Sequence, residues 1–339
     1  MNGTARIRVA HLGLGPIGRE LVKALLDADH LELVGAADIN PQMAGKSLRE
    51  LVDHPKAGGV RVCSSAEELL EDAAPALVTQ TTGSRLDQIY ASLAGVVDAG
   101  VSLVSTAEEL LYPWLRHAQL AEQLHQRAVQ RGSRVLGTGI NPGFVMDLLP
   151  LVLCQPCLDV RRVRAVRVVD VSTRRGQLQV KVGAGLSADE FRARVSAGRL
   201  GHVGLLESAA LLAHKLGWTL ESLEETIEPV LADRPMKTEH VAVTPGLVAG
   251  VHQVARGRTD DGRELLLDLT MTLGAADPHD GVQIDGRPPV EVRVPGGYAG
   301  DAATVATVVN AIPRLPRMPA GLWTVADLPV STVPNLWGR

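Results

Sequence analysis

The sequence predicts an α/β protein of two domains, with a doubly wound parallel sheet first and an α+β domain after it. A length of 339 residues fits two domains. Strand-like and helical runs alternate up to about residue 142, and strands then follow one another with polar and apolar residues mixed. Alternation of strands and helices is typical of a parallel sheet with crossover helices. Strands that follow one another favour a mainly antiparallel sheet covered by helices on one face.

The first domain, residues 1–142, is expected to contain six parallel strands. Their residues are apolar without polar alternation, which indicates a sheet covered on both faces. The expected strands are Ile7–Leu12, Leu31–Ala37, Val60–Cys63, Ala76–Gln80, Val101–Ser105 and Arg134–Gly137. The expected helices are Gly15–Asp29, Ala66–Glu71, Ser84–Ala99 and Leu115–Arg131.

The second domain, residues 143–300, is expected to hold the substrate and the subunit contact. Strands are expected at Val160–Thr173, Glu239–Val243, Leu247–Val254, Glu264–Leu273 and Val290–Val294. Helices are expected at Phe144–Leu153, Ala188–Ala197, Leu205–Leu216 and Leu220–Ile227. Residues 301–339, with a helix over Ala302–Ile312, are expected to return to the first domain.

A Gly-x-Gly-x-x-Gly motif links the first strand to the first helix. Its glycines are Gly13, Gly15 and Gly18, with Pro16 and Ile17 between the last two. Gly13 permits a tight turn, Gly15 lets the backbone approach a pyrophosphate, and Gly18 lets the helix lie close to the sheet. The motif lies between a strand and a helix, and the acidic residue Asp38 follows it. In this context the motif predicts a Rossmann domain that binds NAD or NADP.

Asp38 favours NAD over NADP. A carboxylate at the end of the second strand accepts hydrogen bonds from ribose hydroxyls and repels a 2′-phosphate. Ile39 and Asn40, which follow it, carry no charge to offset that repulsion, although Lys46 is near in sequence.

Ligands of this fold lie beyond the carboxyl ends of the strands, so further cofactor contacts are expected where strands end. The residues that follow the fourth and sixth strands there are Thr81, Thr82, Gly83, Asn141 and Pro142.

Two adjacent carboxylates, Glu108 and Glu109, follow the fifth strand, beside the expected nicotinamide. Such a group binds a cation or moves protons when it faces a cleft, but Glu-Glu pairs also open many helices because carboxylates suit the positive helix end. Side chains that would line a substrate pocket are Tyr112, Phe144, Tyr298 and Thr304, with core packing or helix capping as the alternative.

Composition argues against several other classes of partner. A net charge of −4 gives no reason to expect nucleic acid, and no apolar run is long enough to span a membrane. The start of the chain lacks a signal-peptide core, which favours the cytoplasm. Three cysteines and scattered histidines form no metal-binding pattern, so we expect no metal site.

Several long motifs resemble the 2,4-diaminopentanoate dehydrogenase family, which includes the native amine dehydrogenases. They are Thr106-Ala107-Glu108-Glu109-Leu110-Leu111-Tyr112-Pro113, the stretch from Gly137 to Asp147, Lys181–Leu186, Gly201–Leu205 with Glu207-Ser208, and Gly300 to Pro313 with Asp327-Leu328-Pro329. Ala107 stands where the family usually has Cys. The resemblance covers nearly the whole chain.

The resemblance implies that Glu108 is the catalytic carboxylate, in a reaction that joins ammonia to a ketone or aldehyde, or the reverse oxidation of an amine. It also implies a homodimer. One alternative is a dihydrodipicolinate reductase-like imine reductase that acts on a cyclic substrate without free ammonia, although the basic substrate motif of those enzymes is missing. The other alternative is a cofactor-binding sensor without activity, against which the full second domain argues.

Overall fold

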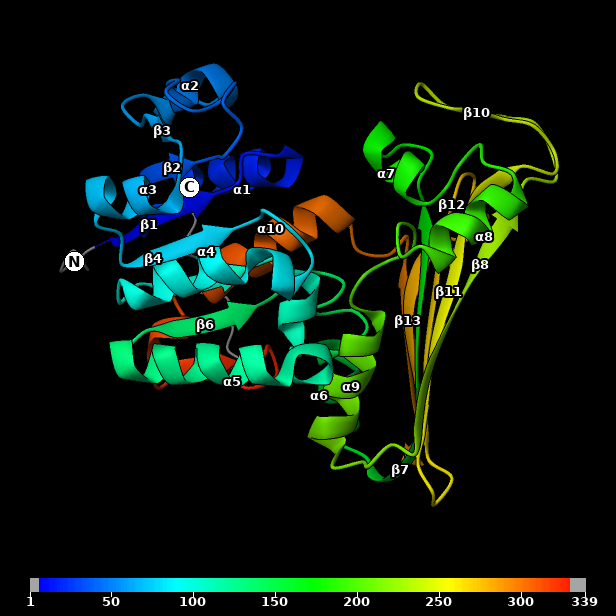
Figure 1. Cartoon of the computed structure of the whole chain (residues 1–339). Coiled ribbons are helices and arrows are strands. Elements are labelled where there is room, and N and C mark those ends of the chain that lie inside the picture. Colours follow the sequence, from blue (N-terminus) through cyan, green and yellow to red (C-terminus); the bar gives the residue numbers. More distant parts are fainter. Residues whose placement is uncertain (1–5, 330–339) are drawn as a thin grey trace. The chain divides into compact units, whose positions relative to one another are not determined.

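The computed structural model describes residues 6–329, which form two compact units (Figure 1). Within that range, residues 6–144 and 299–329 make up the first unit, and Val145–Tyr298 make up the second. The chain therefore leaves the first unit once and comes back to it. The tail expected to return to the first domain includes residues 330–339, which lie outside the described residues.

The sheet of the first unit is parallel throughout and doubly wound, as the sequence predicts. The strands in spatial order are β15 (Gly321–Trp323), β6 (Arg134–Gly137), β5 (Ser102–Ser105), β4 (Leu77–Gln80), β1 (Ile7–Leu12), β2 (Leu31–Ala37) and β3 (Val62–Cys63). Every neighbouring pair is parallel. The short edge strand β15 was not expected, because three residues near the chain end carry no clear strand pattern.

Helices cover both faces of this sheet (Figure 1). On one face lie α3 (Ala66–Ala73), α4 (Leu86–Asp98) and α5 (Trp114–Arg131), and on the other lie α1 (Pro16–Asp27) and α10 (Gly300–Ala311). The short elements are α2 (Leu48–Leu51) and the 3-10 turns η1 (Pro55–Ala57), η2 (Glu108–Leu111) and η3 (Leu315–Arg317). Ala10 and Leu12 of β1 join the core under α3 to α5, which leaves His11 facing α1.

The second unit is built on a six-stranded mixed sheet. Its spatial order is β14 (Val290–Pro295), β13 (His279–Arg287), β7 (Leu158–Asp170), β12 (Glu264–Thr272), β11 (Val248–Arg258) and β8 (Ser222–Leu231). The β7–β12 pair is parallel and the other neighbouring pairs are antiparallel, which confirms a mainly antiparallel sheet. A small ribbon of β9 (Met236–Lys237) and β10 (Ala242–Val243) stands apart.

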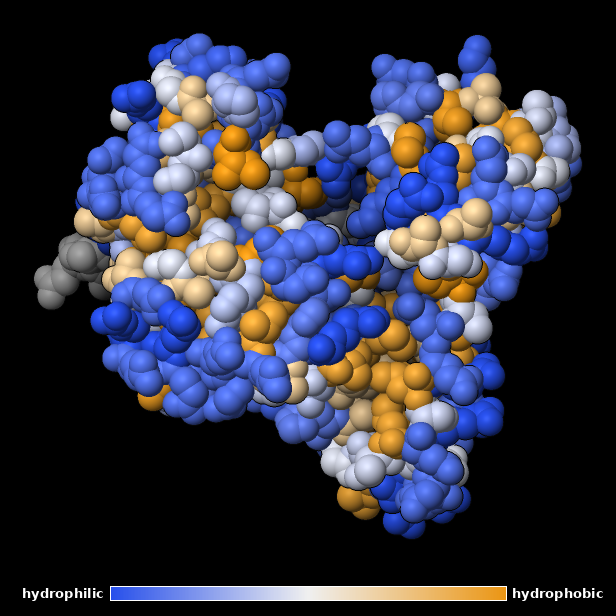
Figure 2. Space-filling view, in the orientation of Figure 1, coloured by the Kyte–Doolittle hydropathy of each residue, from blue (hydrophilic) through white to orange (hydrophobic). Residues whose placement is uncertain are grey.

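Helices cover one face of the second sheet. These are α6 (Leu148–Cys154), α8 (Ala188–Ser196) and α9 (Leu205–Leu216), while α7 (Gly176–Lys181) follows the end of β7. Along β7 the residues Val163, Ala165 and Arg167 are buried, and those between them are partly exposed. Figure 2 shows hydrophobic side chains gathered over the region of α6 and α9, whose sequences are largely apolar.

One predicted helix is wrong, because Leu220–Ile227 lies mostly in strand β8. The spacing of Leu220, Leu223 and Ile227 resembles a helical stripe, but Leu223, Glu225 and Ile227 also alternate with more exposed residues. Ten residues of β8 pair with β11, and this pairing makes the segment a strand. Strand β13 was not expected either, since its two Asp and two Gly residues have low strand propensity.

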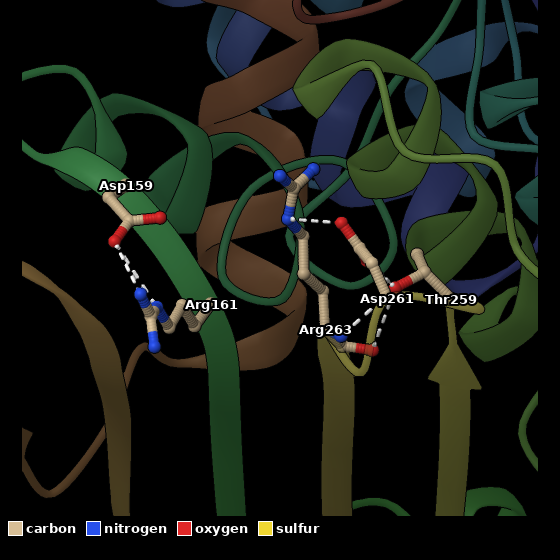
Figure 3. A network of polar contacts seen from close by, with 5 residues as sticks. All are labelled: Asp159, Arg161, Thr259, Asp261 and Arg263. Atoms are coloured by element: carbon tan, nitrogen blue, oxygen red, sulfur yellow. Dashed lines mark hydrogen bonds and ion pairs between the residues drawn. The ribbon is translucent and has the colours of Figure 1, made fainter.

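A polar network closes the hairpin between β11 and β12 (Figure 3). The Thr259 hydroxyl donates to Asp261 over 2.5 Å and accepts from the backbone N–H of Arg263 over 2.9 Å. Arg263 also pairs with Asp261 over 3.3 Å, and its guanidinium lies 5.8 Å from the Trp218 ring centroid. Nearby, Asp159 and Arg161 form an exposed pair at the start of β7. The contacts among Thr259, Asp261 and Arg263 hold the turn that joins β11 to β12.

Among residues 6–329, no helix is long and apolar enough to cross a membrane.

Candidate functional site

The glycine-rich loop is locked by hydrogen bonds to one carbonyl. The Gly13 oxygen accepts from His11 Nε2 over 2.8 Å and from Thr81 Oγ1 over 2.9 Å. Gly13 has φ +99°, and a Cβ on Gly18 would lie 1.8 Å from the same Gly13 oxygen. Only glycine permits that approach of α1 to the end of β1, as the motif predicts.

His11 holds this loop as a neutral imidazole. A carbonyl oxygen only accepts, so Nε2 carries the proton and Nδ1 accepts from the Thr79 hydroxyl over 2.8 Å. The side chain is fully buried, and this burial lowers the pKa of His11 to about 4. Sequence reasoning missed this residue, although a histidine within an apolar strand directly before the motif was a visible signal.

The N-terminus of α1 is open to an anion. Gly15 is the N-cap and Pro16 the first helical residue, and no acidic side chain occupies the first turn. A Cβ on Gly15 would meet no atom within 4 Å. Free N–H groups and the positive helix end therefore face open space, which is the arrangement that binds a pyrophosphate.

Asp38 joins the glycine-rich loop to the turn after β2. Its Oδ2 accepts from the Leu14 N–H over 2.6 Å, and its Oδ1 accepts from the Asn40 N–H over 2.8 Å. Both oxygens are held in place and keep lone pairs for further donors. The carboxylate is thus fixed beside the glycine-rich loop, and Ile39 next to it is 89% exposed.

A cleft of about 260 Å³ brings together five of the residues predicted to bind the cofactor. The predicted residues that line it are Gly13, Gly15, Asp38, Thr81 and Thr82. Pro16, Ile17 and Gly18 in the first turn of α1, and Gly83 in the loop after β4, do not line it. Leu12, Ala37, Ile39, Ser65, Ala66 and Ser92 were not predicted. Ser65 and Ala66 follow β3, so the rule of strand ends would have found them.

The loop after β6 carries Asn141 and Pro142. The loop folds tightly, since a Cβ on Gly143 would lie 2.3 Å from the Gly139 nitrogen. The Asn141 Oδ1 is buried and has no hydrogen-bond partner among residues 6–329. A buried acceptor without a partner is costly unless a ligand donates to it. Thr304 of α10 lies beside this loop, with its methyl group 3.9 Å from a Cβ built on Gly139.

A buried chain of hydrogen bonds connects the cofactor loop to the segment before Glu108. Gln80 donates from Nε2 to the Thr82 hydroxyl over 2.6 Å and accepts at Oε1 from the Ser105 hydroxyl over 2.6 Å. Ser105 Oγ in turn accepts from the Ala107 N–H over 3.0 Å. Gln80 and Ser105 are both buried. The ends of β4 and β5 are therefore rigidly coupled.

The two adjacent carboxylates have different surroundings. Glu109 is buried and accepts from the Leu86 N–H over 2.7 Å and from His117 Nε2 over 2.9 Å. It thus binds the first turn of α4 rather than the start of its own helix. Glu108 is half-buried at the first position of η2. Successive residues of a 3-10 turn point about 120° apart, so the two side chains face different ways.

The aromatic candidates fall in different places. Tyr112 is half-buried and its ring centroid lies 5.4 Å from that of Trp114, and burial raises the pKa of the Tyr112 phenol. Phe144 is half-buried in the first unit, and Tyr298 is the last residue of the second. The Tyr298 backbone N–H donates to Asp280 over 2.7 Å, and its carbonyl accepts from Arg167 over 3.0 Å.

Two groups of three side chains among the described residues have atoms close enough to share an ion. They are Cys63 with Glu68 and Asp72, and Asp87 with Glu109 and His117. Glu68 already accepts from the backbone and hydroxyl of Ser64, and Glu109 from Leu86 and His117. One carboxylate of each group therefore already has donors within the fold.

A parallel doubly wound sheet with this glycine loop and a fixed acidic residue after β2 defines a nicotinamide-dependent oxidoreductase. Residues 144–335 match the model of the 2,4-diaminopentanoate dehydrogenase C-terminal domain. The chain is 30% identical over 336 residues to the 2,4-diaminopentanoate dehydrogenase of Acetoanaerobium sticklandii, covering 96% of this chain and 94% of that protein. The chain belongs to the 2,4-diaminopentanoate dehydrogenase family, as the sequence motifs predict.

Solved structures show the same fold. The amine dehydrogenase from Mycobacterium smegmatis is 26% identical and superposes with a TM-score of 0.84 over 95% of this chain and 96% of that one. The WlbA dehydrogenase from Bordetella pertussis, solved with NADH and UDP-GlcNAcA, is 18% identical with a TM-score of 0.53, over 85% of this chain and 78% of that one. At that identity the second likeness concerns the fold alone.

The low pKa of His11 predicts a loss of stability in mild acid. The unfolded chain takes up a proton as the pH falls through 6.5, whereas the folded protein does not until about pH 4. The free energy of unfolding should fall by up to about 3 kcal/mol between these pH values. Denaturant unfolding of the wild type and of His11→Asn measures this. The fall should be smaller in the variant by that amount, and parallel curves would contradict the assignment.

Proposed function

We propose that this protein is an NAD-linked amine dehydrogenase that reductively aminates a ketone or aldehyde with ammonia and oxidises the product amine in reverse. Membership of the family supports the reaction class, and the relatives named above are dehydrogenases of amines. The observation that carries the proposal is the half-buried Glu108, which follows a rigid strand end coupled to the cofactor loop.

The residues present fit a nicotinamide dinucleotide. The N–H groups at the start of α1 would hold the pyrophosphate, and Asp38 would accept from the adenosine ribose. The Asn141 Oδ1 would accept from the nicotinamide amide, which satisfies a buried oxygen that has no other partner in residues 6–329. The bound cofactor supplies the hydride that reduces the substrate.

Glu108 would manage the charges of the amine chemistry. An ionised carboxylate attracts an ammonium ion, accepts its proton so that ammonia can attack the carbonyl carbon, and returns a proton to the departing water. It also stabilises the cationic iminium that receives the hydride. Tyr112, Phe144 and Thr304 are the proposed walls of the substrate site within the first unit.

Exchange of each carboxylate separately tests this role. Glu108→Gln keeps size but removes the charge, so ammonia-dependent turnover of NADH should fall at least ~10²-fold, while the NADH dissociation constant changes little. Glu109→Gln weakens the contacts to Leu86 and His117, so it should lower the free energy of unfolding by about 1–3 kcal/mol, with much less effect on turnover of the folded enzyme.

The results for the two variants lead to different conclusions. A large loss of turnover in Glu109→Gln but not in Glu108→Gln would move the catalytic role to Glu109, and full turnover in both variants would disprove a carboxylate mechanism.

A panel of ketones, assayed with and without ammonia, distinguishes an amine dehydrogenase from an imine reductase. Oxidation of NADH that needs no ammonia would favour the alternative, a dihydrodipicolinate reductase-like imine reductase acting on a cyclic substrate.

We expect NAD(H) to be preferred over NADP(H). Asp38 is held by two backbone N–H groups and so cannot easily turn away from a 2′-phosphate. Two like charges 4 Å apart repel by about 4 kcal/mol near a protein surface. The ratio of kcat/KM for NADH over NADPH should exceed ~10 and should fall in Asp38→Asn. A strong preference for NADPH in the wild type would overturn the prediction.

We further propose a homodimer formed through the open face of the second sheet. Half-buried apolar residues Val166, Val254 and Leu266 lie on this face. Around them the charges are paired within the chain, Arg162 with Glu264 and Arg164 with Asp268, each over 3.2 Å. An apolar centre with internally paired charges fits a second copy of the same face.

The oligomeric state at micromolar concentration tests this interface. Sedimentation should give the mass of a dimer for the wild type. Leu266→Asp places an unpaired charge at the proposed centre and should shift the mass toward the monomer. Val129→Asp is the matched control, since Val129 is 47% exposed on α5 of the first unit, and it should remain dimeric. A monomeric wild type would refute the proposal.

A further inference from the structure

The hydrogen bonds that connect the segment before Glu108 to the cofactor cleft all run in one direction. The Ala107 N–H donates to Ser105 Oγ over 3.0 Å, and the Ser105 hydroxyl donates to Gln80 Oε1 over 2.6 Å. Gln80 Nε2 then donates to Thr82 Oγ1 over 2.6 Å, and Thr82 lines the cleft. Each group in this series therefore accepts from the side of η2 and donates toward the cleft.

The chemistry of the buried groups fixes that direction. Ser105 is fully buried, and Gln80 is the only acceptor for its hydroxyl hydrogen among residues 6–329. If the Gln80 amide were turned over, its NH2 group would face Ser105 and leave that buried hydrogen without an acceptor, which is unfavourable. Gln80 therefore presents its oxygen to Ser105 and its NH2 group to Thr82.

Thr82 ends the series, and its side chain is held on two sides. Its Oγ1 accepts from Gln80, and its methyl carbon lies 2.9 Å from a Cβ built on Gly13, against the glycine-rich loop. A β-branched side chain that is held at both substituents keeps a single χ1 rotamer. Thr82 is exposed in the cleft, and its hydroxyl hydrogen has no acceptor within residues 6–329. The hydrogen is thus available to an acceptor that enters the cleft.

The other end of the series holds the start of η2. Ala107 is the N-cap of this turn, and Glu108 is its first residue. The Thr106 N–H donates to the Gln80 carbonyl over 3.0 Å, next to the contact between Ala107 and Ser105. Gln80 and Ser105 therefore fix the backbone of both residues that precede Glu108.

An acceptor for the Thr82 hydroxyl would strengthen the whole series. Hydrogen bonds that follow one another polarise each other in a medium of low dielectric constant. A Thr82 hydroxyl that donates to a ligand is a better acceptor for Gln80, and the same gain extends to Ser105. The phosphate and ribose oxygens of a dinucleotide are acceptors of this kind, and the anionic phosphate oxygens are the stronger ones.

We infer that Gln80 is a positioning residue that aims the Thr82 hydroxyl at an acceptor oxygen of the bound dinucleotide and, through Ser105, holds the segment before Glu108. The part of this inference that concerns Glu108 rests on the proposed amine dehydrogenase activity. The part that concerns Thr82 requires only that the cleft binds a dinucleotide. Gln80 itself touches neither cofactor nor substrate and acts through its two hydroxyl neighbours.

Titration of the protein with NADH tests the contact of Thr82. Thr82→Val keeps the shape of the side chain but removes the hydroxyl, so the NADH dissociation constant should rise at least ~3-fold, whereas Thr82→Ser should stay closer to the wild type. Thr307→Val is the matched control, because the Thr307 hydroxyl donates to the Thr304 carbonyl within α10. It should bind NADH as the wild type does. Unchanged NADH binding in Thr82→Val would contradict the inference.

A double-mutant cycle tests the role of Gln80. Gln80→Met removes both side-chain hydrogen bonds and should raise the NADH dissociation constant at least ~3-fold, but it should add little in the Thr82→Val background, because the two residues act as one unit. Gln126→Met is the matched control, since Gln126 is exposed on α5 and bonds only to Glu122. Losses that add in full, or unchanged NADH binding in Gln80→Met, would overturn the positioning role.

Turnover at saturating NADH tests the part that concerns Glu108. Ser105→Ala leaves the Ala107 N–H without its acceptor, so the kcat of ammonia-dependent NADH oxidation should fall at least ~3-fold as Glu108 is held less exactly in place. An unchanged kcat would overturn this part. A wild type without ammonia-dependent turnover would overturn the proposed function and this part together, whereas the NADH dissociation constants would still decide the role of Gln80 in cofactor binding.

Discussion

The carbonyl oxygen of Gly13 is the point on which the cofactor site depends. It receives hydrogen bonds from a buried neutral histidine of β1 and from Thr81 after β4, and the α carbon of Gly18 packs against it. The loop therefore cannot shift without breaking contacts to two strands and a helix at once. These contacts are made within the chain, so they hold the N–H groups of α1 in a fixed orientation, which reduces the ordering that an incoming phosphate would require.

Hydrogen bonds continue from the Gly13 carbonyl and Thr81 across the sheet to the end of β5. Thr82 follows Thr81 in the chain, and the Gln80 side chain joins the Thr82 hydroxyl to the Ser105 hydroxyl. Ser105 in turn accepts from the backbone N–H of Ala107, the residue before Glu108. A buried amide between two hydroxyls leaves little freedom, because each broken contact would leave a polar atom unpaired away from water. The cofactor loop and the proposed catalytic carboxylate are thus parts of one hydrogen-bonded layer along the carboxyl ends of the strands.

The sequence predicted what depends on local pattern and missed what depends on pairing partners. Parallel strands and the glycine loop are encoded by neighbouring residues, so β1 and β2 were predicted to the residue. Strand β8 was mistaken for a helix because the spacing of Leu223 and Ile227 fits both a helix and a strand, and its pairing with β11 is visible only in the structure. Ser92 reaches the cleft from within α4, and no local pattern specifies how that helix packs.

Glu108 and Glu109 show why chemistry is harder to assign than fold. The two residues are identical and adjacent, and position after β5 does not distinguish them; only the family resemblance chose Glu108. The direction of η2 supplies a physical reason. Glu109 is buried, and its Oε2 accepts from the first N–H of α4 and from His117. This carboxylate therefore anchors α4, and its exchange would disturb α4 first. The environment, more than the residue type, distinguishes two adjacent carboxylates of the same kind.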